Sequence, residues 1–161
     1  MTIFLMGIEP SLSAFPCLRE LQGILEAAGY HVDKENIGMR SQSDNEERDL
    51  DRIRACRAVL MVVTSATRTD PRYQRAWEQA IHEHKPIIQL VCGETDVPER
   101  LRVYEAIEFT ECRTAAVQRL LDVLEWVHSP EYERLRRNIS TRITAKDGQP
   151  KKRRKDSAEQ D

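Results

Sequence analysis

The chain has 161 residues, of which 40% are hydrophobic and 32% charged, so it can bury one domain core and still have residues left for an extension. No run approaches the roughly 20 apolar residues that a membrane-spanning helix needs, and the N-terminal stretch lacks the basic flank and long apolar run of a signal peptide. We therefore expect a cytoplasmic protein with no membrane partner. The net charge of −2 hides an asymmetry, because residues 129–161 are basic and the rest of the chain is acidic.

The first segments of the chain alternate between strand and helix patterns. A buried strand is expected over Thr2–Met6 and a second over Tyr30–Val32. Between them, leucines at helical spacing predict one helix with Ser13 as N-cap, Pro16 in its first turn and Gly29 at its end. The opening of the chain therefore indicates a strand–helix–strand unit.

The middle of the chain continues this alternation. A polar loop follows the second strand, and the Ser-x-x-Glu spacing at residues 43–46 matches a capping box that opens a helix. The apolar run Ala58–Val63 does not alternate with polar residues, which predicts a central parallel strand buried on both faces. The next helix is expected to begin with Asp70 as N-cap and Pro71 at its first position. Its apolar stripe consists of Tyr73, Ala76, Trp77, Ala80 and Ile81.

Two further strands and a closing helix complete the predicted domain. The strands are expected over 86–92 and 106–109, and the helix through Val117 to Val127. Strands alternating with helices indicate an α/β fold, which we expect to be a flavodoxin-like three-layer sandwich with a five-stranded parallel sheet of order 2-1-3-4-5. Ligands in such sheets bind at the carboxyl ends of the strands where the winding reverses, so the crevice should lie between loops 7–11 and 64–70.

The composition changes after Val127. We predict three parts, namely a domain over residues 1–128, a C-terminal helix over 129–144 and a disordered basic tail over 145–161. The tail contains the basic cluster Lys151–Lys155, which is the candidate for nucleic-acid binding. Acidic residues surround this cluster and the domain is acidic, so we do not expect a nucleic-acid partner.

The four cysteines, Cys17, Cys56, Cys92 and Cys112, are widely separated and form no CxxC pair. We expect free thiols that fill small spaces at the edges of apolar runs in a reducing compartment. No histidine stands at ligand spacing beside a cysteine, and the two histidines at the end of the third predicted helix point to different faces. The sequence therefore predicts no metal site.

The order and spacing of several segments resemble a known family. They are GYHVD at 29–33, Ile37-Gly38, AVLMVVTS at 58–65, KPII at 85–88 and DVPERL at 96–101. Over about residues 1–127 this succession resembles the Toll/interleukin receptor homology domain, the TIR domain, in its bacterial form. The resemblance implies the flavodoxin-like fold and one of two molecular functions. Many TIR domains are self-associating signalling adaptors, and others cleave the N-glycosidic bond of NAD.

For the signalling activity, the resemblance implies association with itself or with another TIR-containing protein, with no required cofactor. The contacts of such adaptors use the loop after the second strand. In this chain that loop extends from Asp33 to Gln42, and its candidate interface residues are Asp33, Ile37, Gly38 and Met39.

For the NAD-cleaving activity, the resemblance implies a glutamate on the helix after the third strand, where it steadies the ribose as positive charge develops. Counting back from Lys85 in KPII places the expected glutamate at Ala76. Glu78 is two residues away, or roughly 200° around a helix, so it is the catalytic candidate only if the protein is active. The candidate pocket residues are Gly7, Glu9, Ser65 and Trp77.

Three functional hypotheses follow. The leading one is a TIR-like signal-transduction domain that acts by association, because the fold markers are present and the expected acid is replaced by Ala76. The alternative is an NAD glycohydrolase that produces nicotinamide and ADP-ribose with Glu78 as its acid. The third is a nucleoside deoxyribosyltransferase-like enzyme, because IFLMG before a helix resembles the start of those sheets. That family has an Asp-Gly-Thr turn before its glutamate, whereas this chain has Thr69-Asp70-Pro71.

Overall fold

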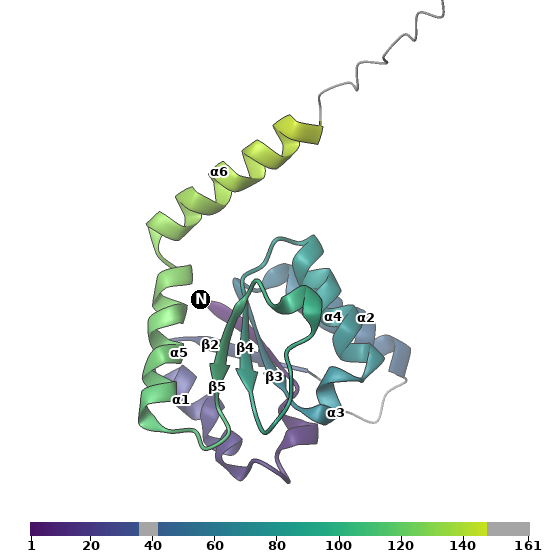
Figure 1. Ribbon diagram of the computed structural model, residues 1–161, viewed down its shortest axis with the longest axis vertical. Coiled ribbons are helices and arrows are strands. Elements are labelled where there is room, and N and C mark those ends of the chain that lie inside the picture. Colours follow the sequence, from purple (N-terminus) through teal and green to yellow (C-terminus); the bar gives the residue numbers. More distant parts are fainter. Residues whose placement is uncertain (36–41, 148–161) are drawn as a thin grey trace, which may run out of the picture. The chain divides into compact units, whose positions relative to one another are not determined.

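The computed structural model describes residues 1–35 and 42–147, and it divides the chain into two units, 1–127 and 128–161. The first unit contains a parallel sheet and the helices that cover it (Figure 1). In the second unit the described residues form helix α6 (Pro130–Asp147).

The sheet has five parallel strands in the order β2-β1-β3-β4-β5, which confirms the flavodoxin-like topology predicted from the sequence. The strands are β1 (Thr2–Met6), β2 (His31–Lys34), β3 (Ala58–Val63), β4 (Ile87–Val91) and β5 (Glu105–Glu108). All positions of β3 are buried, as its uninterrupted apolar run predicted. A strand that is covered on both faces needs apolar side chains in both directions.

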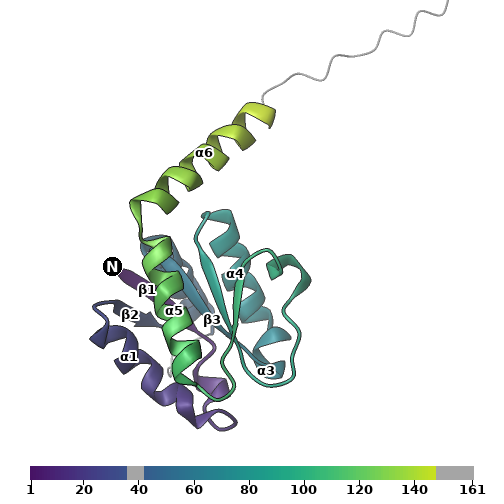
Figure 2. The ribbon, with the colours of Figure 1, turned by 60° about the vertical axis from the view of Figure 1, so that its left-hand side comes forward.

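Two sets of helices cover the two faces of the sheet, as Figure 2 shows. Helices α1 (Leu21–Ala27) and α5 (Thr114–Val127) cover one face. Helices α2 (Gln42–Ala55), α3 (Ser65–Arg68) and α4 (Pro71–His82) cover the other. On the second face, alternate side chains of the strands pack against α2 and α4, and the buried cluster includes Phe4, Ile53, Met61, Tyr73, Ala76, Trp77 and Ile87.

The chain between β1 and β2 differs from the single helix predicted to begin at Ser13. It forms two short 3₁₀ helices, η1 (Glu9–Ser11) and η2 (Pro16–Glu20), and α1 begins only at Leu21. Proline has no N–H to donate and disfavours helical geometry in the residue before it, and Phe15 indeed has φ of −130° and ψ of 73°. The prediction of one continuous helix was therefore wrong.

The cysteines also differ from the prediction in part. Cys56 and Cys92 are free and buried, as expected. Cys17 and Cys112 form a disulfide whose Cα atoms are 6.0 Å apart, so the prediction of four free thiols was wrong for this pair. The two residues are 95 positions apart in the sequence and become neighbours only when the fold brings η2 beside the turn after β5.

Lys85 links the end of α2 to the start of β4. Its ammonium group donates to the carbonyl of Arg54 at 2.9 Å and to the carbonyl of Cys56 at 2.8 Å. The last carbonyls of a helix have no partner within the helix, and the helix dipole makes this end negative. One cation therefore satisfies two acceptors at the C-terminus of α2.

The helix formed by the described residues of the second unit has an ordinary N-terminal cap. Ser129 Oγ accepts a hydrogen bond from the Tyr132 N–H at 3.2 Å, and Glu131 and Glu133 occupy the first turn, where acidic side chains complement the helix dipole. The helix extends to Asp147, beyond the boundary predicted at 144. The basic cluster 151–155 lies outside the described residues.

Within 1–35 and 42–147, no helix is both long and apolar enough to cross a membrane.

The cap formed by Lys85 gives a first prediction about stability. Replacing Lys85 with methionine keeps the length of the side chain but removes both hydrogen bonds and the charge at the helix end. We expect the free energy of unfolding to fall by about 1–2 kcal/mol, measured by urea denaturation. Lys34→Met, at an exposed position on β2, is the matched control and should change it by less than about 0.5 kcal/mol. Equal effects of the two substitutions would contradict the capping role.

Candidate functional site

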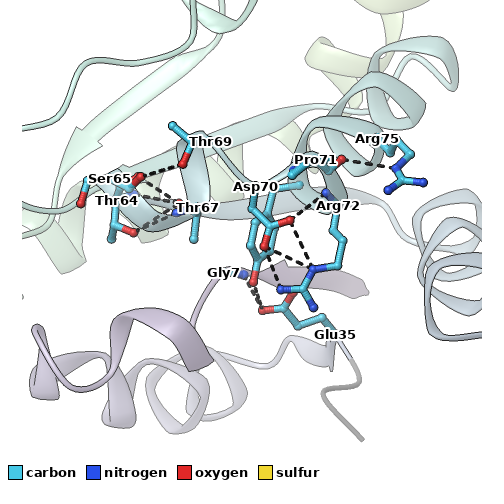
Figure 3. A network of polar contacts seen from close by, with 11 residues as sticks. Gly7, Glu35, Thr64, Ser65, Thr67, Thr69, Asp70, Pro71, Arg72 and Arg75 are labelled. Carbon is cyan, nitrogen blue, oxygen red and sulfur yellow. Dashed lines mark hydrogen bonds and ion pairs between the residues drawn. The ribbon is translucent and has the colours of Figure 1, made fainter. Parts of the chain in front are cut away.

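The carboxyl ends of β1, β2 and β3 come together where the winding of the sheet reverses. Gly7 follows β1, Glu35 follows β2 and Thr64 follows β3. Figure 3 shows these residues at one corner with Asp70, the N-cap of α4, and Pro71, its first residue. The strand order predicted a ligand crevice near this corner, between loops 7–11 and 64–70.

The carboxyl group of Glu35 joins the three segments. Its Oε1 atom accepts a hydrogen bond from the Gly7 N–H at 2.7 Å and a second from the Tyr73 hydroxyl at 3.2 Å. A buried main-chain N–H without an acceptor is costly, and the Glu35 side chain supplies that acceptor just beyond the end of β1. Glu35 therefore connects the sheet to α4.

Burial raises the pKa of Glu35 to about 7, because the charged form loses its water shell. The Asp49 carboxylate also raises it, whereas the hydrogen bonds from Gly7 and Tyr73 and the Arg72 guanidinium lower it. Near neutral pH this carboxyl group therefore exists in both the protonated and the ionised form. Perturbed carboxyl groups of this kind are characteristic of functional sites, although structural networks also produce them.

The first turn of α4 supplies the other polar groups of the corner. Asp70 caps the helix by accepting from the Arg72 N–H at 2.9 Å, and it also pairs with the Arg72 guanidinium at 2.8 Å. This pairing holds the pKa of Asp70 below its usual value. The guanidinium lies 5.7 Å from the centre of the Tyr73 ring and beside Glu35 (Figure 3). The turn thus presents a hydroxyl donor and a cation to the Glu35 carboxyl.

Buried hydroxyl groups fix the backbone around the crevice. Ser11 donates to the Gly7 carbonyl at 2.7 Å, and Thr67 donates to the Val62 carbonyl at 2.9 Å. Thr67 Oγ1 also accepts from the Thr64 N–H at 2.8 Å, which forms one half of a capping box for α3. All three hydroxyl residues are 5% exposed or less, so we assign them to the framework of the site.

A cavity of about 510 Å³ lies beside the end of β2. It is lined by Leu5, Ile8, Glu9, Asp33, Lys34, Glu35 and Arg52. Arg52 is already engaged, since its Nε lies 3.4 Å from the Asp33 carboxylate and its Nη1 donates to the Lys34 carbonyl at 2.5 Å. The carboxyl groups of Glu9 and Glu35 give this cavity the chemistry to accept hydrogen bonds from the hydroxyls of a ligand.

The candidate pocket residues occupy different surroundings. Gly7 packs tightly, with a positive φ of 84°, and an added Cβ atom would lie 2.6 Å from the Val62 carbonyl oxygen. Glu9 is exposed in η1 and lines the cavity, and Ser65 is exposed at the start of α3. Trp77 is only 6% exposed and packs in the core, where the Arg100 guanidinium lies 5.5 Å from its ring centre. Gly7 and Glu9 are thus near Glu35, whereas Trp77 belongs to the core on the α4 side.

Glu78 lies on the outer flank of α4. Its side chain is 39% exposed, accepts from Gln74 Nε2 at 3.2 Å and pairs with the Arg100 guanidinium at 3.4 Å. Glu78 follows Tyr73 by five residues, about 140° around the helix, so it points away from the face that contacts Glu35. Ala76, where a catalytic glutamate was expected, is 8% exposed and packs in the core cluster.

The candidate interface residues are described only in part. Asp33, at the end of β2, pairs with Arg52 of α2. Ile37, Gly38 and Met39 lie outside the described residues, so their role in association stays a prediction. Among the described residues, no group of three or more His, Cys, Asp or Glu side chains is placed to hold a metal ion.

Sequence reasoning did not single out Glu35, and it interpreted Tyr73 only as part of an apolar stripe. A signal for Glu35 was nevertheless present. It stands directly after the second strand, and the carboxyl ends of parallel strands are where sites of this fold are built. The contact with Tyr73 spans 38 residues and depends on the packing of α4, which no local pattern shows.

Comparison with known proteins identifies the family. A sequence profile of the TIR domain family matches residues 16–121, which extend from the start of η2 through β5 into α5. The chain belongs to the TIR domain family. Among curated proteins, none matches the sequence of this chain.

Two solved structures share the fold of this TIR domain. One is the CMP N-glycosidase BcmB of Clostridium botulinum, with a TM-score of 0.58 and 17% identity over 78% of this chain and 98% of that one. The other is a 2-deoxyribosyltransferase of Bacillus psychrosaccharolyticus, with a TM-score of 0.55 and 12% identity over 73% of this chain and 96% of that one. At these identities the similarity establishes the flavodoxin-like fold alone.

The buried carboxyl group gives a prediction about pH. The folded pKa of Glu35, about 7, exceeds its ordinary value of 4.5, so its contribution to stability is full below about pH 4.5 and is lost as the pH rises through 7. Glutamine imitates the protonated form at every pH. We therefore expect Glu35→Gln to match the wild type near pH 4 and to exceed its free energy of unfolding by about 1–3 kcal/mol near pH 8.5, measured by urea denaturation.

The exposed Glu9 provides the control, because it lines the same cavity as Glu35. The free energy of unfolding of Glu9→Gln should depend on pH in the same way as that of the wild type. If Glu35→Gln instead lowers stability at both pH values, the carboxyl group is ionised and favourable in the folded domain, and the assignment of a raised pKa fails.

Proposed function

We propose that this TIR domain acts in signal transduction by associating with itself or with another TIR-containing protein. The observation that carries the proposal is the burial of Ala76 in the core, at the position where the resemblance led us to expect a glutamate. The nearest acid along the helix, Glu78, is engaged with Arg100 on the outer flank. A domain that has the family fold but lacks the catalytic glutamate is suited to protein–protein association.

The predicted contact region follows β2. Asp33 and Glu35 mark the beginning of this region, and both are fixed to the helices of one face, Asp33 to α2 and Glu35 to α4. A loop whose first residues are anchored in this way loses less conformational freedom when it binds, because part of the ordering cost is met in the free domain.

Sedimentation over a concentration series tests this proposal. We expect the wild-type chain to assemble as its concentration rises, or to be recovered from cells with a TIR-containing partner. Met39→Asp in the predicted interface loop should weaken association roughly tenfold or more, because a charge buried in an interface is costly. Val103→Asp is the control, since Val103 is an apolar side chain with 86% exposure that precedes β5.

Two outcomes would count against association. One is a strict monomer at the highest soluble concentration with no TIR-containing protein recovered. The other is an equal effect of Met39→Asp and Val103→Asp, which would show a general response to added charge.

A second candidate function is N-glycosidic cleavage with NAD as substrate, and Glu35 is the observation that favours it. N-glycosidic cleavage has an oxocarbenium-like transition state that needs a nearby carboxylate. Glu35 is partly buried, sits at the carboxyl edge of the sheet and lines a cavity large enough for part of a nucleotide. The two similar solved structures bear the names of a CMP N-glycosidase and a 2-deoxyribosyltransferase.

Nicotinamide release from NAD tests this second candidate. We expect Glu35→Gln to reduce release by a hundredfold or more, whereas Glu78→Gln should retain it, because Glu78 faces away from the crevice. The wild-type rate should rise with pH through about 7, as Glu35 ionises. Loss of release on Glu78→Gln alone would restore Glu78 as the acid, and no release by the wild type would remove NAD cleavage.

A further inference from the structure

The four cysteines fall into two chemically different pairs. Cys56 and Cys92 are 2% and 1% exposed, and burial raises the pKa of each thiol to about 11, so neither forms a reactive thiolate near neutral pH. Cys17 and Cys112 are both partly exposed and are bonded to each other. Their Cα separation of 6.0 Å lies in the ordinary range for disulfides, so no backbone movement is needed to make the bond.

The disulfide joins segments that noncovalent contacts already hold together. The ring of Phe15 packs against Gly93, where an added Cβ atom would lie 3.1 Å from the ring edge. The Gly93 N–H donates to Thr110 Oγ1 at 2.9 Å. These contacts bring the chain after β1, the chain after β4 and the turn after β5 to one corner. The corner should therefore stay folded when the disulfide is reduced.

The turn that contains Cys112 has an unusual backbone conformation. Cys112 has a φ of 45°, in the left-handed region that non-glycine residues seldom adopt. The same residue lines a cavity of about 470 Å³ between β5 and α5, together with Glu108, Thr110, Arg113 and Arg119. The disulfide thus fixes one wall of this cavity to η2, on a different part of the chain.

We propose that Cys17 and Cys112 form a thiol–disulfide switch that exchanges with small disulfides such as glutathione disulfide and sets the conformation of the turn 110–113. In the oxidised form the turn is tied to η2. In the reduced form the noncovalent contacts of Phe15, Gly93 and Thr110 remain but the covalent tie is lost, so the wall of the cavity is free to move.

The exchange proceeds in two balanced steps. The thiolate of one cysteine attacks a sulfur of glutathione disulfide, which forms a protein–glutathione disulfide and releases one glutathione thiolate. The thiolate of the second cysteine then attacks the protein sulfur of that mixed disulfide, which forms the Cys17–Cys112 bond and releases the second glutathione. The two protein thiols lose two electrons and two protons in total, and one glutathione disulfide becomes two molecules of glutathione.

Equilibration of the full chain in buffers of graded glutathione and glutathione disulfide tests the proposal. After an acid quench and alkylation, mass spectrometry should show one transition, in which the reduced protein carries two additional alkyl groups that map to the peptides of Cys17 and Cys112. Cys56 and Cys92 should react with the alkylating agent only after unfolding. Hydrogen exchange of residues 110–113 should be several-fold faster in the reduced form.

Single substitutions test whether the two cysteines exchange with glutathione or form a bond that does not exchange. Cys17→Ser should leave Cys112 able to carry a glutathione adduct, and Cys112→Ser should do the same for Cys17, whereas Cys56→Ala should leave the transition unchanged. The proposal fails if the wild-type pair stays reduced at every glutathione ratio. It also fails if reduction unfolds the domain, or if hydrogen exchange at 110–113 is the same in both forms.

Discussion

The Gly7 N–H needs an acceptor just where β1 ends, and much of the candidate site depends on how this need is met. Gly7 cannot be replaced freely, because its positive φ and the closeness of the Val62 carbonyl leave no room for a side chain. The backbone at this point is therefore held close to β3, and its N–H is directed toward the end of β2. Glu35 provides the acceptor, and Tyr73 of α4 binds the same oxygen atom. One carboxyl group thus fixes the relation of β1, β2 and α4.

Because of this arrangement, Glu35 both stabilises the fold and carries a carboxyl group with an altered pKa. A carboxyl group that accepts two hydrogen bonds usually has a low pKa, but burial outweighs those bonds here and raises the pKa of Glu35 to about 7. Arg72 is close enough to lower the pKa, yet its guanidinium is shared with Asp70, so it neutralises Glu35 incompletely. The crevice consequently retains a carboxyl group that can gain or lose a proton near neutral pH.

The sequence allowed the sheet to be predicted well because its strands have strong local patterns. The apolar run Ala58–Val63 and the Asp70-Pro71 start of α4 each encode their structure within a few residues. The strand order then followed from general rules of chain connection. The first helix was mispredicted because the leucine periodicity extends across Pro16, whereas the proline breaks the helical geometry at Phe15.

The contacts that define the site could not be predicted in the same way. The Glu35–Tyr73 hydrogen bond spans 38 residues, and the disulfide spans 95. Contacts of this kind depend on the register and packing of complete elements, so a single sequence contains no local pattern for them. The apolar stripe correctly placed Ala76 on the packing face, because a helix converts sequence spacing into rotation and the structure buries Ala76 in the core.

The face of α4 on which residue 76 lies explains why a glutamate at this position would be unfavourable. Ala76 is 8% exposed among apolar side chains, so a glutamate there would have to ionise inside the core or remain protonated. Tyr73, one turn earlier, is the residue that α4 directs toward the crevice, and it binds a carboxyl group that comes from β2. The helix therefore contributes a hydroxyl to this crevice, and the acid is supplied from the other side. Any catalytic chemistry at this corner would therefore have to use the Glu35 carboxyl group together with the Tyr73 hydroxyl.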